Sequence, residues 1–335
     1  MSMKNRQVLL KSRPVGIPQA EHFEIIEREM PLLAEGQILV RNRYLSVEPA
    51  MRGWVNLVAN YEDPVAVGSV MRSLAAGRVE RSNHADYQAG DFVMGWFGWQ
   101  DYAAVSVDAV QRKVTETDLP LSTSLGVLGL NGLTAYFGLY EVGSPRAGDT
   151  VVVSTAAGSV GSCVGQLAKL KGCRTVGIAG GAQKVAQCKD LFGYDAAIDY
   201  KSAQLDSALA AACPKGVDVY FDNTAGSISD AVYQQLSVGA RVVICGTASV
   251  SNWNPPPSGP RVERTLLVKR ARMQGFVIFQ YASRYTEALS HLANWIREGK
   301  LTYCEDILNG IEHAPDAIAG LYRGENLGKR LIKIA

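Results

Sequence analysis

Residues 151–172 have the pattern of a strand, a small-residue turn and a helix, which is the most informative candidate for a ligand-binding site in this chain. Apolar β-formers lead into the small-residue turn Ala156-Ala157-Gly158-Ser159-Val160-Gly161, after which Val164 and Leu167 begin a helical repeat. Small residues let the backbone approach a pyrophosphate, whose charge the following helix N-terminus stabilises. The spacing Ala-x-Gly-x-x-Gly has Ala156 in place of the usual first glycine, so a tight turn that binds nothing remains an alternative. We expect a dinucleotide-binding turn.

The end of the next expected strand, within residues 175–184, distinguishes the two nicotinamide dinucleotides. An NAD site would place Asp or Glu there, about twenty residues after the glycines, to accept from the ribose hydroxyls. This strand ends instead in Gly180-Gly181, and Lys184 opens the following helix. A 2′-phosphate would meet space and positive charge, which favours NADP(H). Read alone, Lys184 could also be an ordinary solvated helix cation.

The elements around this turn follow two different patterns. Between residues 150 and 248, apolar strands alternate with helices, which predicts a doubly wound parallel sheet. From Gln7 to about Lys113, short β-type runs are separated by Gly, Pro and Asp, which indicates an antiparallel β-rich region. These runs cover residues 37–47, 77–82, 90–96 and 102–107.

A helical stripe begins near Tyr285, with Gly299 as its expected end. Its apolar members are Ala288, Leu289, Leu292, Trp295 and Ile296. The tail from Leu301 returns to short β-type pieces, so we expect it to rejoin the N-terminal domain. The proline-rich residues 254–260 indicate a surface or site-lining loop.

Composition narrows the function classes. The 335 residues are 47% hydrophobic, enough for two cores, and the net charge of +2 comes from 34 basic and 32 acidic residues mixed along the chain. We therefore expect neither a nucleic-acid nor a membrane partner. The chain also lacks a spanning apolar stretch and the apolar block of a secretory signal, so we expect a cytoplasmic protein.

The six cysteines and four histidines are scattered, without a Cys-x-x-Cys pair or the spacing of metal ligands. We interpret the cysteines as reduced packing residues and expect no metal site.

Eight motifs together resemble a known family. They are LNGLTAYFGLYEVG (130–143), AAGSVGSCVGQLAKLKGC (156–173), VGIAGGAQK (176–184), DYK (199–201), YFDNTAG (220–226), VVICG (242–246), RMQGFVIF (272–279) and GENLGK (324–329). In this order, over almost the whole chain, they resemble the zinc-independent, NADP-dependent alkenal/enone reductase branch of the medium-chain dehydrogenase/reductase superfamily. That branch contains the prostaglandin and curcumin reductases.

The resemblance implies a GroES-like β-rich catalytic domain over residues 1–125, a Rossmann domain that binds NADP(H) over 126–300, and a return to the catalytic domain over 301–335. It implies reduction of the carbon-carbon double bond of α,β-unsaturated aldehydes and ketones, by a homodimer joined through the Rossmann domain. Single members of the site keep ordinary alternatives, since Tyr200 could simply cap a strand and Asn223 could be a turn residue.

The implied cofactor residues fall into three groups. Gly158, Ser159, Val160 and Gly161 would meet the pyrophosphate, and Lys184 and Tyr200 would meet the 2′-phosphate. The nicotinamide half would be surrounded by Asn223, Cys245, Gly246, Thr247, Ser251, Phe276, Val277, Ile278 and Asn326, with Thr134 nearby.

Two positions depart from the family pattern. Ala50 and Ser251 stand where the family commonly has tyrosines that hold the enone, so the usual phenolic donor is missing. Trp54 and Trp253 follow closely and could rebuild aromatic walls of the substrate pocket. A donor must still stabilise the developing enolate, and a cofactor ribose hydroxyl, a held water or Ser251 could serve. We expect Ser251 to contribute modestly at most.

Other functions remain open. A quinone reductase of the same superfamily can share the Ala-x-Gly-x-x-Gly turn, but it matches the DYK, FDN and GENLGK pieces less well. The missing tyrosines also leave room for an NADPH-binding sensor with weak catalysis. A zinc-dependent alcohol dehydrogenase is disfavoured, because no Gly-His-Glu segment and no four-cysteine lobe occur.

Overall fold

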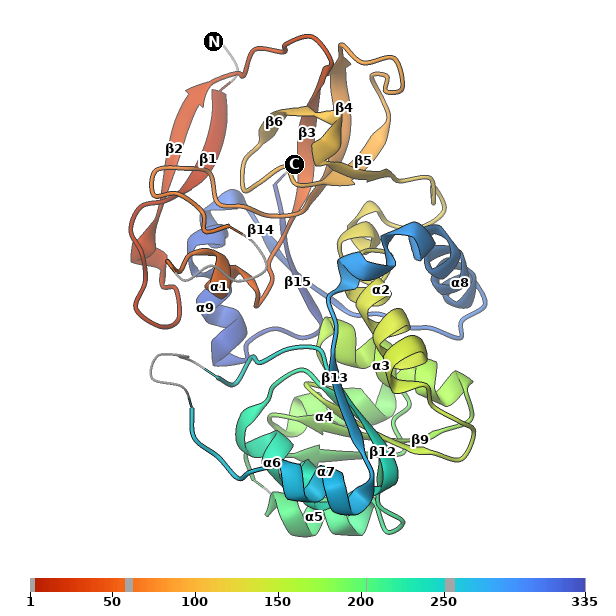
Figure 1. Cartoon of the computed structure of the whole chain (residues 1–335). Helices are drawn as coiled ribbons and strands as arrows, with labels where there is room; N and C mark the ends of the chain where they lie inside the picture. The colour runs from red at the N-terminus through yellow and green to blue at the C-terminus, as the bar shows by residue number, and fades with distance from the viewer. Residues whose placement is uncertain (1–3, 58–62, 203, 251–256, 335) are drawn as a thin grey trace. The chain divides into compact units, whose positions relative to one another are not determined.

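The computed structural model describes residues 4–57, 63–202, 204–250 and 257–334. The chain forms two compact units, the first built from Met1–Gly126 and Glu305–Ala335 and the second from Val127–Cys304. Their ends lie close to the expected boundaries near residues 125 and 300. Figure 1 shows that both chain ends belong to the first unit.

The second unit contains a six-stranded sheet in the order β10-β9-β8-β11-β12-β13. Every neighbouring pair is parallel. The strands are β8 (Thr150–Ser154), β9 (Arg174–Ala179), β10 (Ala196–Asp199), β11 (Val217–Asp222), β12 (Leu236–Ile244) and β13 (Arg272–Gly275). The chain starts in the middle at β8, builds outward to β10, and then crosses to β11 on the other side of β8. The expected doubly wound parallel sheet is therefore confirmed, with the strand order of a dinucleotide-binding fold.

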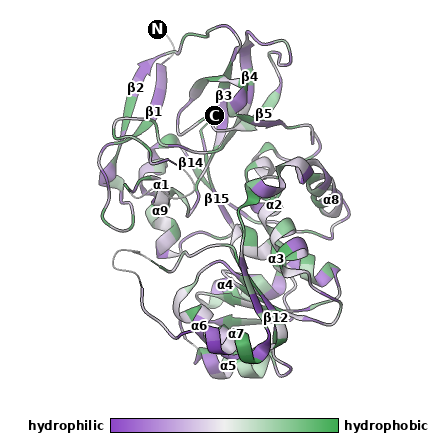
Figure 2. Ribbon diagram, viewed as in Figure 1, coloured by the Kyte–Doolittle hydropathy of each residue, from purple (hydrophilic) through white to green (hydrophobic). Residues whose placement is uncertain are grey.

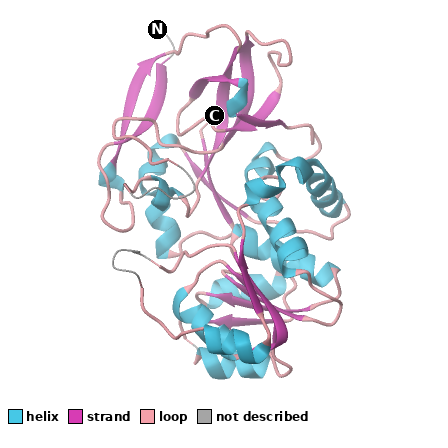
Figure 3. Ribbon diagram, viewed as in Figure 1, coloured by secondary structure: helices cyan, strands magenta, loops and turns pink. Residues whose placement is uncertain are grey.

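Helices alternate with these strands as crossover connections (Figure 3). They are α3 (Ser159–Leu170), α4 (Ala182–Asp190), α5 (Leu205–Ala212), α6 (Gly226–Gln234) and α7 (Glu263–Lys269). Leu209 of α5 and Val232 of α6 share one core with Val152, Val176 and Tyr220 of the sheet. Figure 1 shows α5, α6 and α7 grouped together. All five residues of β8 are buried, as expected for a central parallel strand covered on both faces.

Two more helices complete the second unit: α2 (Leu130–Phe137), which continues into a wider turn over Gly138–Gly143, and α8 (Tyr285–Arg297). The expected stripe on α8 is confirmed in its first part, where Ala288, Leu289 and Leu292 are buried, whereas Trp295 and Ile296 are half-buried. Figure 2 shows hydrophilic and hydrophobic residues side by side along this helix. A residue in left-handed conformation, Gly299 with φ 68°, follows its end.

The first unit is β-rich, as expected. One sheet runs β14-β15-β3-β4-β5-β7, with β6 also paired to β3, and β1 and β2 form a separate antiparallel pair. The strands are β1 (Lys4–Leu10), β2 (Phe23–Glu29), β3 (Gln37–Ser46), β4 (Ala75–Ser82), β5 (Phe92–Gly95), β6 (Tyr102–Ser106), β7 (Val110–Lys113), β14 (Glu305–Asn309) and β15 (Lys329–Lys333). The tail joins this sheet through β15, which pairs with β3.

The tail is not made of β-type pieces alone, however. Between β14 and β15 it forms α9 (Ala314–Arg323), whose Ala317 and Ile318 pack in the core of the first unit. This helix lets β14 and β15 pair in parallel, because parallel neighbours need a crossover between them. The short helix α1 (Met51–Trp54) follows β3, and short 3-10 turns cover Ala20–His22, Val107–Ala109, Leu121–Leu125, Ile278–Arg284 and Ile311–His313.

Candidate functional site

The carboxyl ends of the six parallel strands bring most of the expected cofactor residues to one edge of the sheet. The strands β8, β9, β10, β11, β12 and β13 are followed, respectively, by residues 155–161, Gly180-Gly181, Tyr200, Asn223, residues 245–247 and residues 276–278. In open parallel sheets ligands bind outside these ends, where the strand order reverses. The reversal lies between β8 and β11. The fold thus places this set at the edge of the sheet where a ligand is expected.

The turn after β8 requires glycine at its last position. A Cβ on Gly161 would lie 2.3 Å from the carbonyl oxygen of Thr155 and 2.9 Å from Cα of Ala156, closer than atoms can approach. Thr155 has φ 53°, and its carbonyl oxygen accepts a hydrogen bond from Gly158 N at 2.9 Å. The backbone therefore bends sharply enough to bring the N-terminus of α3 against the strand end, as pyrophosphate binding needs.

Ala156 is the departure from the three-glycine fingerprint, and the structure shows how it is tolerated. Its side chain is fully buried and faces Gly177 of β9, where a Cβ would lie 2.8 Å from Cβ of Ala156. The small residue needed at this contact is thus supplied by the neighbouring strand. The turn is further anchored by Tyr194, whose buried hydroxyl donates to the carbonyl oxygen of Gly161 at 2.6 Å.

Gly180 and Gly181, expected near the adenosine 2′-phosphate, lie between the end of β9 and the start of α4, and Lys184 is in the first turn of α4. Asp199, the last residue of β10, accepts a hydrogen bond from Gly181 N at 2.9 Å. Tyr200 is exposed, and its ring lies beside Gly180. Sequence reasoning missed Asp199 and Lys201, although the DYK motif contained both.

Asn223 at the end of β11 is held by β8. Its Nδ2 donates to the carbonyl oxygen of Ser154 at 2.7 Å, and its backbone N–H donates to Ser154 Oγ at 2.8 Å. The next strand leaves the sheet beside it, because Cys245 N and Gly246 N both donate to the carbonyl oxygen of Asp222. These bonds end β12 at Ile244, so the strand expected over residues 240–248 begins and ends four residues earlier.

A buried carboxylate supports this part of the edge. Asp222 is fully buried, and its two oxygens accept from Ser229 Oγ at 2.6 Å, from Ala225 N at 2.9 Å and from the Tyr220 hydroxyl at 3.1 Å. Burial, with a smaller contribution from Asp222, raises the pKa of the Cys245 thiol to about 12. Cys245 therefore stays protonated, and Asp222 fixes the turn that presents Asn223.

The remaining residues of this unit lie around α2 and the end of β13. Phe276 packs onto Gly138 and Phe221, since a Cβ on Gly138 would lie 2.6 Å from Cζ of Phe276. Val277 is exposed, and Ile278 and Thr134 are half-buried.

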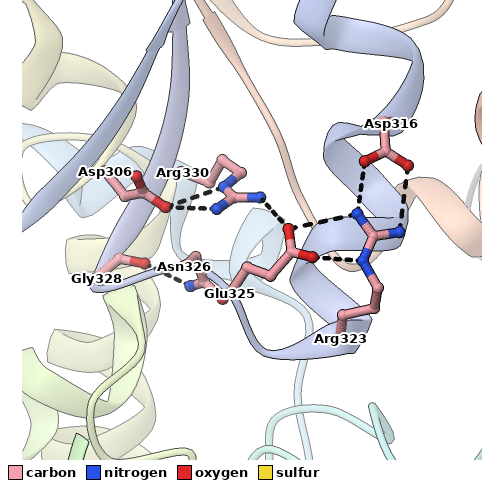
Figure 4. Close-up of polar contacts among 7 residues, drawn as sticks. All are labelled: Asp306, Asp316, Arg323, Glu325, Asn326, Gly328 and Arg330. Atoms are coloured by element: carbon pink, nitrogen blue, oxygen red, sulfur yellow. Dashed lines mark hydrogen bonds and ion pairs between the residues drawn. The ribbon is translucent and has the colours of Figure 1, made fainter. Parts of the chain in front are cut away.

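Asn326 belongs to the first unit, in the loop between α9 and β15. Its Nδ2 donates to the carbonyl oxygen of Gly328 at 2.8 Å. Figure 4 shows the charge network beside it: Arg330 contacts Asp306 and Glu325, and Arg323 contacts Glu325 and Asp316. The Arg330 side chain is only 6% exposed, and its Nη2 lies 2.7 Å from Asp306 Oδ2. This network holds both ends of the loop that presents Asn326.

The neighbouring cation on β15 is buried as well. Lys329 Nζ donates to Glu48 Oε1 at 2.6 Å and to the carbonyl oxygen of Val47 at 3.0 Å. In the parallel β14–β15 pair, Lys329 is also the partner of Glu305. Lys329 therefore ties the Asn326 segment to the loop that carries Ala50. This pair was not foreseen, because its partners are far apart in sequence.

The structure describes only two of the expected substrate-pocket residues, both in the first unit. Ala50 is half-buried against the core, and Trp54 is 4% exposed and packs edge-on against Trp96 with ring centroids 5.7 Å apart. The Trp54 indole N–H is buried without a hydrogen-bond partner in the described part of the chain. Ser251 and Trp253 lie outside the described residues.

In the part of the chain that the structure covers, no group of three His, Cys, Asp or Glu side chains could hold a metal ion. All six cysteines are free. None of the described helices is long and apolar enough to cross a membrane.

Comparisons with known proteins agree with this architecture. Residues 6–113 match the family described as the N-terminal domain of oxidoreductase, and residues 159–294 match the family described as zinc-binding dehydrogenase. An NADPH-dependent curcumin reductase of Escherichia coli is 43% identical, covering 99% of this chain and 97% of its own. A 2-alkenal reductase (NADP(+)-dependent) of Nicotiana tabacum is 38% identical, covering 99% and 98%.

Among solved structures, CurA in complex with NADPH from Vibrio vulnificus is 42% identical, with a TM-score of 0.93, over 98% of this chain and 99% of that one. The matched residues include both units. The chain therefore belongs to the NADP-dependent alkenal/enone reductase branch of the medium-chain dehydrogenase/reductase superfamily.

Proposed function

We propose that this protein is an oxidoreductase that uses NADPH to reduce the carbon-carbon double bond of α,β-unsaturated aldehydes and ketones. The second unit is the NADP-binding Rossmann domain, and the first is the GroES-like catalytic domain. The observation that carries the proposal is the glycine-dependent turn after β8, which lies at the carboxyl edge of the sheet beside the topological reversal between β8 and β11. The NADPH-dependent relatives agree with it.

The described residues fit this cofactor. The Gly158–Gly161 turn leads tightly into the N-terminus of α3, where a pyrophosphate would bind, and Lys184 in the first turn of α4 is the proposed cation for a 2′-phosphate. Asn223, residues 245–247 and residues 276–278 follow β11, β12 and β13 and are the proposed residues around the nicotinamide half. Thr134 and, in the first unit, Asn326 complete the proposed cofactor set.

When bound, NADPH would supply the hydride for the β-carbon, and the proton for the α-carbon would come from solvent. The chain must orient the enone, exclude water and stabilise the developing enolate. Ala50, Trp54 and Trp253 are the proposed pocket residues, and Ser251 contributes modestly at most. Because Ala50 and Ser251 lack a phenol, we propose that cofactor placement provides most of the rate acceleration.

We further propose that the reaction is zinc-independent and that the protein is cytoplasmic. Support for the first comes from the scattered cysteines and histidines and the absence of a Gly-His-Glu segment.

A direct assay tests the function. After dialysis against EDTA, NADPH oxidation at 340 nm is followed with enals, enones and quinones, and NADH is the control cofactor. We expect turnover of enals and enones with NADPH and much weaker turnover with NADH. Turnover of quinones alone would favour a quinone reductase, and tight NADPH binding without turnover would favour a sensor. Loss of activity on EDTA treatment that zinc restores would contradict zinc independence.

We also propose a homodimer joined through the second unit. β13 is the edge strand of the parallel sheet, and among described strands it pairs only with β12, which leaves one row of backbone groups for another chain. Apolar side chains near this edge are exposed, including Leu267 at 78%, Val268 at 60% and Phe279 at 39%. An open edge with exposed apolar residues is suited to a second copy of this chain.

Replacing Leu267 and Val268 together with glutamate should convert the dimer into monomers, because it places charges in an apolar contact. Size-exclusion chromatography with light scattering would measure the mass. Leu170→Glu, on α3 at a residue that is 41% exposed, is the matched control and should leave the dimer intact. A double variant that remains dimeric would show that these residues lie outside the interface.

A further inference from the structure

Asp199 is an acidic side chain in a place where a 2′-phosphate would be expected to avoid one. It ends β10, and Oδ1 accepts hydrogen bonds from Gly181 N at 2.9 Å and from Lys201 N at 3.0 Å. These backbone bonds lower the pKa of Asp199, with the Gly181 bond contributing most. The carboxylate therefore joins the turn after β9 to the turn after β10.

The joined turns bring two further side chains over Gly180. A Cβ at Gly180 would lie 2.9 Å from Cε1 and 3.1 Å from the hydroxyl of Tyr200, and 3.0 Å from Cε of Lys201. Tyr200 is also fixed through its backbone, because its N–H donates to the carbonyl oxygen of Ala179 at 3.2 Å. Glycine at position 180 thus leaves space that the phenol and the lysine stem occupy. The Lys201 side chain is exposed, so its ammonium is available to an anion.

We propose that Asp199 is a positioning residue for the 2′-phosphate site of NADP(H) and that Lys201 is a second cation of that site, beside Lys184. This proposal rests on the proposed function, because it concerns how the same cofactor is recognised. Asp199 acts through the backbone: it sets the path of Gly181 and Lys201 and so directs Tyr200 and Lys201 across Gly180. A charged acceptor engaged by two amide donors has much of its charge satisfied before any phosphate approaches.

An alternative role for Asp199 predicts the opposite effect of its removal on the binding of the 2′-phosphate. If the charge of Asp199 acted mainly at a distance, it would repel a phosphate dianion, and its removal would strengthen binding. If its hydrogen bonds act mainly by positioning, its removal weakens binding. Asparagine separates the two effects, because its amide oxygen can still accept from Gly181 N and Lys201 N while the charge is lost.

The experiment measures the binding of 2′,5′-ADP and of 5′-ADP by calorimetry, without turnover, in the intact protein. The variants are Asp199→Ala, Asp199→Asn and Lys201→Gln. The control is Lys189→Gln, which removes an exposed lysine near the end of α4. The wild type should prefer 2′,5′-ADP; equal affinity for both ligands would overturn the proposed cofactor, and this inference with it.

If the wild type shows that preference, Asp199→Ala should lower the affinity for 2′,5′-ADP by about tenfold and Lys201→Gln by about fivefold. This is the scale of one charge-assisted contact. The affinity of Asp199→Asn for 2′,5′-ADP should stay within about threefold of the wild-type value, and the affinity for 5′-ADP should change little in all variants. Tighter 2′,5′-ADP binding in Asp199→Ala, or unchanged binding in Lys201→Gln, would overturn the inference alone. If Asp199→Ala does not fold, Asp199→Ser, whose hydroxyl is too short to reach both amides, should show the same loss.

Discussion

Gly161→Ala is expected to lower NADPH affinity by about 100-fold and to destabilise the protein by about 2 kcal/mol, the usual scale for overpacking. The added methyl would lie 2.3 Å from the carbonyl oxygen of Thr155 and 2.9 Å from Cα of Ala156. Both are backbone atoms, so relief requires a shift of the turn or of α3. Either shift moves the amide groups that would bind the pyrophosphate. Fluorescence titration with NADPH and urea unfolding would measure the two effects.

Substitutions at two other glycines serve as comparisons for Gly161→Ala. A Cβ on Gly158 would lie 3.0 Å from Cγ2 of Thr155, so Gly158→Ala should be milder. A Cβ on Gly259 would come no closer than 3.4 Å to Asp230 Oδ2, an ordinary contact, so Gly259→Ala should leave NADPH affinity unchanged. Equal affinities in Gly161→Ala and Gly259→Ala would show that the tight turn does not form the cofactor site.

The parallel sheet could be predicted from sequence because each strand-turn-helix repeat is formed by residues that are close together in the chain. A strand, a small-residue turn and a helix follow one another within residues 150–172, and the pattern recurs along the chain. The tolerance of Ala156 could not be predicted in this way. It depends on Gly177 in a neighbouring strand, and only the β8–β9 register brings the two together.

The supporting polar contacts were missed for the same reason. Asp199 meets Gly181 through the pairing of β10 with β9, and Lys329 meets Glu48 across most of the chain length. In sequence these residues resemble ordinary surface charges. The motifs FDN, DYK and GENLGK did contain Asp222, Asp199 and Lys329, but a motif does not say which neighbour each side chain meets.

The helix α9 was also not predicted from the sequence. Its apolar residues Ala314, Ala317 and Ile318 follow helical spacing, but the segment is short and lies between two β-type runs. The expectation of β pieces alone was wrong because pairing β14 with β15 in parallel requires a crossover. That requirement is visible only once the sheet order is known.

The buried charge on β15 leads to the second large effect. Lys329→Met is expected to destabilise the protein by about 3–5 kcal/mol, because it leaves a partly buried carboxylate without its cation. The Lys329 side chain is 4% exposed and that of Glu48 is 15% exposed, with Nζ and Oε1 2.6 Å apart. The carbonyl oxygen of Val47 would lose its donor as well. Urea unfolding of the intact protein would measure the loss.

The loss should also depend on pH. Burial raises the pKa of Glu305, and Lys329 partly opposes that rise, so its removal raises the folded-state value further. A carboxyl whose folded pKa exceeds its unfolded value carries no penalty at low pH and destabilises the fold as pH rises through that range. The difference in unfolding free energy between the wild type and Lys329→Met should therefore be larger at pH 8 than at pH 5.

Two comparisons make this prediction specific. Lys333→Met removes an exposed lysine from the same strand and should cost less than about 0.5 kcal/mol. Adding Glu48→Gln to Lys329→Met should recover part of the lost stability, since no unpaired charge then remains at that contact. Because Lys329 joins the Asn326 segment to the Ala50 loop, Lys329→Met should also raise the KM for an enone more than it lowers kcat. If Lys329→Met were as stable as Lys333→Met, the Lys329–Glu48 pair would not hold these two segments together.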